Sequence, residues 1–440
     1  MAAQMTNYQC PACTGPMRFL PDTGKTECEY CGSVFELAEI EALYQNQAEQ
    51  PQADTSADTW DMSSLTEDWG ADANGMKTYN CPACTAELIC DETTAASCCP
   101  YCGNPAILPG QFSGTLKPDY VLPFKLEKED AVAALKRHYS KRFFLPRSFT
   151  SQNHIEQVQG VYVPFWLFDG KAEGMAGFEA TRSRTYMQGE YRVTDTQHYQ
   201  VTRAGSVEFE KVPVDASTKM PDGHMDSIEP YDYSEMKPFS TAYLPGFLAD
   251  KYDVSAEDSQ SRVDERWENT LVNELRNTVT GYETVNKTRQ HVRLHRGEVH
   301  YALLPVWMLN TKWQGQDFLF AMNGQTGKMV GDLPVDWKKY WTTFFSIGGI
   351  LSLLCALMIW FFQLSDAPFE TTMVAVAVSF VLSLLVCTIL KLGMKNVYIG
   401  SEAGKYISAP LQLTRRQDQF THTTTRRVRI QQQKQDAPRP

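Results

Sequence analysis

The sequence predicts a multidomain protein with two small β zinc ribbons, an α+β domain and a two-helix transmembrane hairpin. Three observations lead to this expectation. A four-cysteine motif occurs twice near the amino terminus, a central region mixes helical and strand patterns, and two long segments near the carboxyl terminus carry no charge. With 440 residues, the chain has room for about two to four domains.

Eight of the twelve cysteines occur in C-x-x-C pairs with a repeated spacing. Fourteen residues separate the two pairs of each motif, and residues 8–32 and 79–103 agree at eleven aligned positions. Two short turns joined by a β-hairpin supply the four thiolates that zinc binds in a tetrahedron. The motifs therefore predict zinc ribbons at residues 8–35 and 79–108. The predicted zinc ligands are Cys10, Cys13, Cys28 and Cys31 in ribbon one, and Cys81, Cys84, Cys99 and Cys102 in ribbon two.

Four thiolates close the coordination shell of zinc, so we expect two structural ions and no catalytic metal. Iron also binds four thiolates, and metal-free redox dithiols are a further alternative. Cys90 and Cys98 lie outside the ligand set and are expected to be small buried residues. No apolar signal segment opens the chain, which favours a reducing compartment.

The net charge of −11 is distributed unevenly. Residues 1–110 hold three basic and sixteen acidic side chains, a net of −13, whereas residues 391–440 hold ten basic and three acidic ones, a net of +7. Nucleic-acid binding needs a cationic surface. The ribbons are therefore expected to contact a protein partner and not phosphate.

Residues 36–78, between the ribbons, contain ten acidic residues and one lysine. This composition predicts a flexible acidic linker. Its tryptophans, Trp60 and Trp69, either dock on a partner or on the following domain, or are incidental exposed side chains.

We expect an α+β domain over residues 117–335. Helical periodicity predicts helices near 128–141 and 256–279. The segments 164–174 and 305–315 share Pro, Trp, Lys and Gly, as two related halves or two independent strands would. Period-two patterns predict strands at residues 160–168, 191–203, 291–309 and 318–330.

Signs of catalysis are missing from the sequence, and we expect no enzyme. Residues 324–329, GQTGKM, lack the spacing of a phosphate loop and predict a hairpin turn. The acidic stretch at 226–235 lacks calcium-loop spacing and is expected to be a solvated loop. A turn at Arg296-Gly297 would place Arg293 opposite His300 and Glu298 opposite His295, which favours polar cross-strand pairs over a metal site.

Thr342–Phe362 and Thr371–Leu390 are uncharged segments of 21 and 20 residues. Each is close to the ~20 residues that cross a bilayer, so they predict a transmembrane hairpin over residues 342–390; two buried core helices are the alternative. The connecting loop has no Lys or Arg. Lysines flank the outer ends, and the positive-inside rule then predicts a cell-membrane protein with two spans and both termini cytoplasmic. The flanking lysines are Lys338, Lys339, Lys391 and Lys395.

Residues 391–440 are expected to form a basic cytoplasmic tail beside an anionic membrane surface, which attracts each basic residue by about 1 kcal/mol. The same tail could instead bind the acidic amino-terminal third or a nucleic acid. The basic residues predicted to contact the membrane surface are Lys391, Lys395, Arg415, Arg416, Arg426, Arg427 and Arg429.

The chain resembles, over nearly its full length, a family of bacterial membrane proteins described as transcription factor IIB-type zinc-ribbon-containing proteins. The two ribbons, the hairpin, and the segments KPDYVLPF, GVYVPFWLF and SIEPYDYSEMKPFSTAYLPGFLADKYDV carry this resemblance. Some members are labelled primosomal protein or helicase, although this sequence lacks a phosphate loop. Relatives of this kind are described as acting with phage-shock-type membrane stress proteins as membrane anchors, so the resemblance implies a scaffolding role.

These expectations combine into a membrane-anchored adaptor that recruits a protein partner to the cytoplasmic membrane face. A nucleic-acid-linked replication or transcription accessory that uses the basic tail is the second hypothesis. An enzyme of unrecognised type would instead show a deep pocket lined by ionisable groups with shifted pKa values.

Overall fold

A computed structural model describes the chain in several stretches that fall into two compact units, residues 1–59 and 60–440. The described residues are 17–20, 25–28, 34–36, 59–65, 69–73, 75–91, 94, 98–105, 108–111, 116–140, 142–152, 157–362 and 368–429.

The first unit holds a three-stranded antiparallel sheet. β1 (Met17–Leu20) pairs with β2 (Lys25–Cys28), which pairs with β3 (Val34–Glu36). Cys28 ends β2, while the other predicted ligands of ribbon one, Cys10, Cys13 and Cys31, lie outside the described residues. The strands fit the β-hairpin expected between the two cysteine pairs.

The second unit is organised around a sheet of twelve strands. The strands are β4 (Met76–Asn80), β5 (Glu87–Asp91), β6 (Leu108–Gln111), β7 (Tyr120–Val121), β8 (Gln159–Gln188), β9 (Tyr191–Asp215), β10 (Lys237–Pro238), β11 (Leu248–Asp250), β12 (Thr284–Trp313), β13 (Gln316–Asn323), β14 (Met329–Val330) and β15 (Ile407–Arg429). The α-helices are α2 (Lys128–Tyr139), α3 (Arg147–Gln152), α4 (Asp222–Ile228), α5 (Ala256–Asn277), α6 (Trp337–Phe362) and α7 (Pro368–Leu392).

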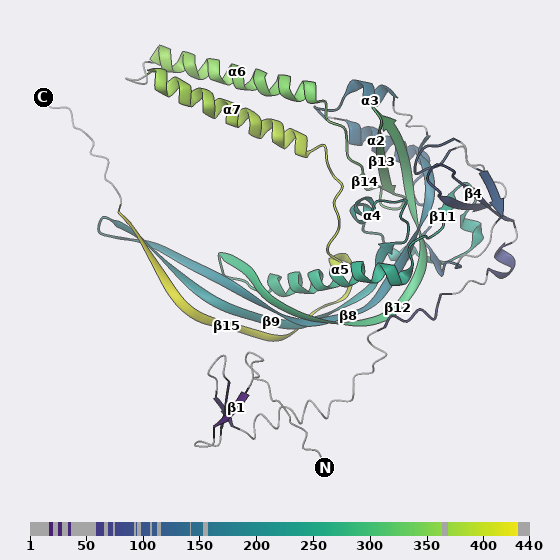
Figure 1. Ribbon diagram of the computed structural model, residues 1–440, viewed down its shortest axis with the longest axis horizontal. Coiled ribbons are helices and arrows are strands. Elements are labelled where there is room, and N and C mark those ends of the chain that lie inside the picture. Colours follow the sequence, from purple (N-terminus) through teal and green to yellow (C-terminus); the bar gives the residue numbers. More distant parts are fainter. Residues whose placement is uncertain are drawn as a thin grey trace. The chain divides into compact units, whose positions relative to one another are not determined.

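Four long strands run together in the order β12, β8, β9, β15, all antiparallel (Figure 1). The 30 residues of β8 extend for roughly 100 Å at ~3.3 Å per residue. α5 packs along one face, where the indole of Trp267 stacks on Phe209 with ring centroids 4.9 Å apart. Gly170 permits this contact, because a Cβ there would lie 2.5 Å from the Trp267 ring.

The two predicted helices of the central domain are confirmed as α2 and α5. The side chain of Ser255 caps α5 by accepting a hydrogen bond from the Asp258 amide. Apolar residues four positions apart, Val263, Trp267 and Leu271, turn one face of α5 toward the sheet. Three of the four predicted strands are present as parts of the longer strands β8, β9 and β12, whereas the strand expected at residues 318–330 is divided by a turn into β13 and β14.

The predicted hairpin turn near 324–329 is confirmed between β13 and β14. The side chain of Asn323 accepts hydrogen bonds from the amides of Gln325 and Thr326, each at 2.9 Å. Gly327 has a φ of 77°, a conformation that glycine adopts at little cost. The turn is therefore stabilised by local hydrogen bonds between the Asn323 side chain and the backbone that follows it.

The turn expected at Arg296-Gly297 is wrong, because β12 continues through it with a β-bulge between Arg296 and Val299. Both flanks of β12 pair with the single long strand β8, so one continuous ladder satisfies their backbone groups. The expected cross-strand pairs are therefore also wrong. The partners observed are Glu173 for Arg293, Lys171 for His295 and Leu167 for His300.

The linker prediction is wrong from Trp60 onward. Trp60 and Trp69 are 7% and 8% exposed, and the Trp60 ring lies 4.7 Å from that of Phe168. The Asp61 amide donates to Gly297 O at 2.9 Å, so this segment pairs with the bulge in β12. Burial of two large aromatic surfaces outweighs the polar composition of their neighbours. Residues 37–58 of the linker lie outside the described residues.

Residues 407–429 of the expected basic tail form an edge strand instead, while residues 430–440 lie outside the described residues. β15 pairs with β9 along its whole length, and Arg416 lies opposite Arg203. Arg203 is fully buried and ion-pairs with Asp418 on β15, while Arg429 pairs with Glu190 at 2.7 Å. Ladder hydrogen bonds, which composition does not reveal, hold these residues in the sheet.

The solvated loop expected at 226–235 is wrong for its first half, whereas Asp232 in its second half is exposed as expected. Asp226 and Glu229 are 5% and 6% exposed, and arginines of α5 neutralise them. Arg262 contacts Asp226 at 2.5 Å, and Arg266 donates to both oxygens of Glu229 at 3.1 and 2.7 Å. Buried carboxylates need such partners because the loss of water destabilises the charge.

α6 and α7 form an antiparallel pair, and both are long and apolar enough to span a membrane. The hydroxyl of Ser383 donates to Phe344 O across the pair at 2.7 Å. At the base, Tyr340 and Cys387 are buried against Phe144 and its neighbours in the core. The pair is therefore attached to the sheet-bearing unit through a packed apolar contact.

Replacement of Arg266 by Met should destabilise the protein by about 3–5 kcal/mol, because Glu229 would remain buried without its partner. Thermal unfolding of the detergent-solubilised full chain measures this. Lys125→Met, at the exposed pair with Glu235, is the control and should change stability by less than about 1 kcal/mol. Equal losses in the two variants would contradict the assigned role of the buried pair.

Candidate metal centre

Two matching turns of the second ribbon bring its four cysteines together. Cys81 follows β4, and its amide donates to Ala86 O at 2.9 Å while the Thr85 amide donates to Cys81 O at 2.8 Å. The second turn repeats this pattern: the Cys99 amide donates to Asn104 O at 2.8 Å, and Gly103 to Cys99 O at 2.9 Å. The shared pattern is the structural counterpart of the repeated C-x-x-C pair.

Both turns contain a residue with positive φ, at Thr85 (60°) and Gly103 (69°). Glycine accepts this conformation readily, as expected for Gly103, whereas a β-branched residue adopts it at a cost. The Thr85 hydroxyl donates to Cys84 O at 2.7 Å, a local bond that supports the turn. The position of Thr85 therefore indicates a geometry imposed by the four-thiol cluster.

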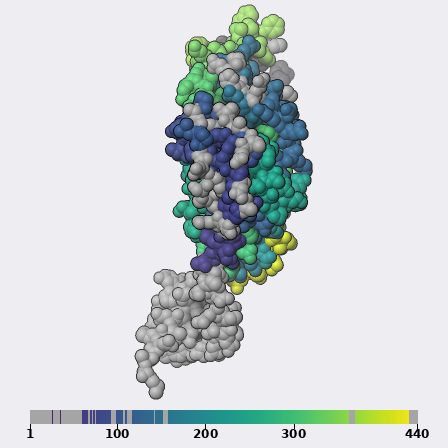
Figure 2. All heavy atoms as spheres, turned by 90° about the vertical axis from the view of Figure 1, so that its right-hand side faces the viewer, coloured from purple at the N-terminus to yellow at the C-terminus, as the bar shows by residue number. Residues whose placement is uncertain are grey.

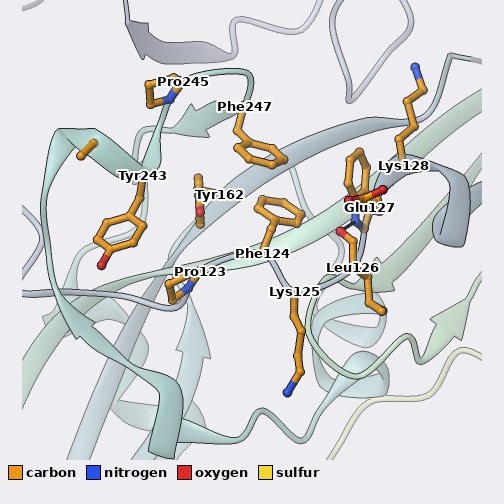
Figure 3. Close-up of a pocket in the computed structure, with 12 residues that line it drawn as sticks. Pro123, Phe124, Lys125, Leu126, Glu127, Lys128, Tyr162, Tyr243, Pro245 and Phe247 are labelled. Carbon is orange, nitrogen blue, oxygen red and sulfur yellow. Dashed lines mark hydrogen bonds between the residues drawn. The ribbon is translucent and has the colours of Figure 1, made fainter.

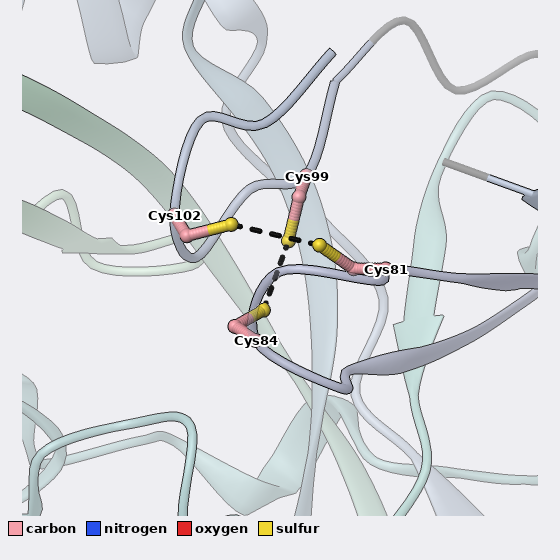
Figure 4. A group of neighbouring side chains, drawn as sticks. All are labelled: Cys81, Cys84, Cys99 and Cys102. Carbon is pink, nitrogen blue, oxygen red and sulfur yellow. Dashed lines mark hydrogen bonds between the residues drawn. The ribbon is translucent and has the colours of Figure 1, made fainter. Parts of the chain in front are cut away.

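The four sulfur atoms converge on one point (Figure 4). All lie within 4.8 Å of one another, and the pairs Cys81–Cys102 and Cys84–Cys99 are each 3.6 Å apart. A tetrahedron with zinc–sulfur bonds of about 2.3 Å has sulfur–sulfur separations of about 3.8 Å. The observed spacing fits a four-coordinate metal such as zinc.

Burial and hydrogen bonds give the thiols different acidities. Burial raises the pKa of Cys81, but amide donors at Cys84 and Ala83 and the neighbouring thiols outweigh it and lower that pKa to about 7. Burial raises the pKa of Cys84 to about 11 and also raises that of Cys99. One thiolate forms easily, while a cation is needed to stabilise all four.

The donor set fits zinc. Four thiolates would fill the tetrahedral shell and leave no position for water or substrate. The side-chain amide of Asn104 lies 3.9 Å from Cys81 Sγ and can orient that ligand from outside the shell. Cys81 and Cys99 are 2% and 1% exposed, which shields their bonds to a metal from solvent.

The cluster is attached to the main sheet through several elements. β5 pairs with β11, and β11 pairs with β8, so the ribbon continues the large sheet. The side-chain amide of Asn310 on β12 donates to Tyr101 O, and Lys219 donates to the Thr85 hydroxyl at 3.3 Å. In Figure 2, dark blue atoms of this part of the chain lie beside teal and green atoms from later parts of the second unit.

A buried polar group behind the second turn was not predicted from the sequence. Asp250 on β11 is 1% exposed and accepts a hydrogen bond from the Ser217 hydroxyl at 2.6 Å. Burial raises its pKa to about 7, and burial beside Asp250 raises the pKa of the Tyr101 phenol. No sequence pattern predicts this group, because Tyr101, Ser217 and Asp250 are far apart in the sequence.

The remaining predicted residues do not join the cluster. Cys90 is fully buried, as expected, and burial raises its pKa to about 11. Cys98, expected to be buried as well, is only half-buried, and it accepts a hydrogen bond from the side-chain amide of Gln159 at 2.8 Å. Lys391 lies in the last turn of α7 and Lys395 three residues beyond its end, whereas the predicted membrane-binding arginines at 415–429 lie on β15.

An aromatic pocket of about 480 Å³ lies away from the thiols (Figure 3). Phe124 and Phe247 stack in it at 4.1 Å, beside Tyr162 and Trp307. The Lys125 ammonium on its rim pairs with Glu235 outside the pocket. The lining offers apolar contact surface.

A second pocket, of about 300 Å³, is lined by Asp226, Glu229 and Arg266. Burial raises the pKa of Glu229, while Arg266 lowers it. These groups bond to one another and to the backbone of the 398–404 segment. Their hydrogen bonds connect α4 and α5 to the 398–404 segment and so stabilise the fold.

The fold and the cluster define a sheet-rich protein that carries two apolar helices and a cluster of four cysteines with the geometry to bind a metal. The chain belongs to the same family as the uncharacterized protein YdjG of Bacillus subtilis (strain 168). The two sequences are 36% identical over 343 residues, which cover 78% of this chain and 94% of YdjG. No family model matches the chain, and no solved structure matches it.

The Cys81→Ser/Cys84→Ser variant should lose one of about two zinc ions per chain, because two ligands cannot retain the metal. Elemental analysis of the purified full chain measures this. Acidification should release zinc from the wild type, since protons compete for thiols whose pKa values burial has raised. Cys90→Ser is the control and should keep the wild-type metal content; unchanged metal in the double variant would exclude this centre.

Asp250→Asn should stabilise the protein above pH 7. The pKa of Asp250 is about 7 when folded and 3.8 ordinarily, so the folded state holds this proton more tightly. Stability therefore falls as the pH rises from about 4 to about 7, by at most about 4 kcal/mol. The gain in melting temperature over wild type should grow between pH 5 and 8. Asp317→Asn, at an exposed site, should show no such trend.

Proposed function

We propose that the protein is a membrane-anchored, zinc-binding adaptor or scaffold that recruits a protein partner to the cytoplasmic membrane face. The observation that carries this proposal is that the thiol cluster and the base of the helical pair belong to one folded unit. Because one folded unit connects the helical anchor to the surface of the cysteine turns, a partner bound at those turns would be held at the membrane.

The surface of the second ribbon suits contact with protein. Its turns expose uncharged residues, namely Pro82, Ala83, Thr85 and Gly103. Residues 79–103 contain no Lys or Arg, so the cation density that phosphate binding needs is missing from this segment. A partner of complementary shape would gain affinity mainly from apolar contact at these turns.

The anchor is the pair α6 and α7, with two structural zinc ions in the ribbons and both termini in the cytoplasm. Support for this topology comes from Lys338, Lys339, Lys391 and Lys395, which lie at one end of the pair. Support for the first zinc ion comes from the motif that ribbon one shares with ribbon two. We assign no catalytic residue.

The resemblance to transcription factor IIB-type zinc-ribbon membrane proteins suggests a partner class. Phage-shock-type membrane stress proteins are the candidates, and the role would then be part of a membrane stress response. The helical anchor and the acidic amino-terminal region are the features that fit such a scaffold.

A nucleic-acid accessory is the second candidate, favoured by the arginines of β15. Arg415, Arg416, Arg426 and Arg427 are exposed along one long edge strand. Because β15 belongs to the sheet, substitution tests this role better than truncation. Steeply salt-sensitive RNA or DNA binding, lost in Arg426→Gln/Arg427→Gln, would support it.

Affinity purification from native membranes, read by mass spectrometry, tests the adaptor role. Proteins recovered with the wild type should be lost with Cys81→Ser/Cys84→Ser, because the turns that present the surface depend on the metal. Cys98→Ser/Cys355→Ser removes two thiols outside the cluster and should keep the partner. If the partner stays bound to all three forms, the second ribbon is not the docking module.

A further inference from the structure

The loop between α2 and α3 packs across the ends of both apolar helices. Phe144 O accepts a hydrogen bond from the Asp336 amide at 2.8 Å, just before α6, and the Phe144 ring lies 5.3 Å from that of Tyr340. Arg142 donates to Gly393 O, just after α7. Figure 1 shows α3 beside the end at which α6 begins. The loop and the two helix ends thus form one continuous surface.

Exposed aromatic and basic side chains share this surface. Phe143 is 47% exposed, and the ammonium of Lys339 lies 4.4 Å from the centre of its ring. Trp337 is 53% exposed, and the ammonium of Lys391 lies 4.6 Å from its ring. Because each ammonium lies over the face of an exposed ring, this surface presents apolar and positively charged groups side by side.

Basic side chains outnumber acidic ones around the helix ends. Six are described there: Arg142, Arg147, Lys338, Lys339, Lys391 and Lys395. The nearby carboxylates, Asp332 and Asp336, accept hydrogen bonds from the backbone amides of Asn396 and Lys339. The cations are therefore only partly neutralised by their surroundings.

We propose that this collar, the loop at 142–147 with the ends of α6 and α7, binds the headgroups of anionic phospholipids. The inference rests on the proposed membrane-spanning pair, because that pair places its charged end at the headgroup level. Anionic headgroups match the cations, and the bilayer interface matches the exposed Phe143 and Trp337 rings. The folded unit then contacts the membrane at a third point besides its two helices.

The collar predicts a preference for anionic lipid in the purified full chain. Native mass spectrometry in neutral detergent counts bound phosphatidylglycerol and phosphatidylcholine with the same acyl chains. The wild type should retain phosphatidylglycerol preferentially, and Arg147→Gln/Lys338→Gln/Lys395→Gln should weaken this binding about tenfold or more. The matched control is Lys237→Gln/Lys287→Gln/Arg289→Gln, which removes three exposed charges from the sheet and should bind like the wild type.

Three results would overturn the collar: equal phosphatidylglycerol binding by the collar variant, equal retention of phosphatidylcholine, or displacement of lipid by millimolar inorganic phosphate. Alkaline carbonate extraction of membranes separates this failure from failure of the anchor. The collar variant should stay in the membrane pellet because α6 and α7 are intact. Extraction of the wild type itself would instead reject the membrane-spanning pair.

Discussion

The antiparallel pairing of β8 with β12 is the contact on which the rest of the structure depends. It begins near Gln159 opposite Met308 and continues to Thr181 opposite Thr284. β9 and β15 extend it on one side, and β11 connects the cysteine ribbon to it near Val161. A ladder of this length holds strands from distant parts of the chain, including β11 and β15, in one sheet.

The two Pro-x-Trp segments lie on these central strands. Pro164 is opposite Leu303, and Pro305 is opposite Tyr162, so the segments are direct neighbours. Each indole N–H donates to a backbone carbonyl, Trp166 to Val254 at 3.0 Å and Trp307 to Leu126 at 3.1 Å. Such a partner compensates the buried indole N–H for the loss of water, so both sites combine the same residue type with a loop carbonyl.

Metal coordination and sheet packing support each other at the second ribbon. The turns at Thr85 and Gly103 place four sulfurs within reach of one ion, and burial raises the pKa values of Cys84 and Cys99, so these two thiols resist ionisation without a cation. Burial also raises the pKa of Asp250 on β11, the strand that pairs with β5. The four-cysteine segment is thus a local structure, shaped to bind a metal, that is embedded in a larger core.

The sequence by itself determined the elements whose signals are local. The C-x-x-C spacing predicted the thiol cluster at Cys81–Cys102, periodicity predicted α2 and α5, and unbroken apolar runs predicted α6 and α7. Only the tertiary structure decided that Trp60 is buried, that β12 continues through a bulge after Arg296, and that the arginines at 415–429 lie on a strand. Each of these depends on a partner far away in the chain, and composition does not encode that partner. Strand pairing and burial are non-local, so they overrode the local signals of linker, turn and tail.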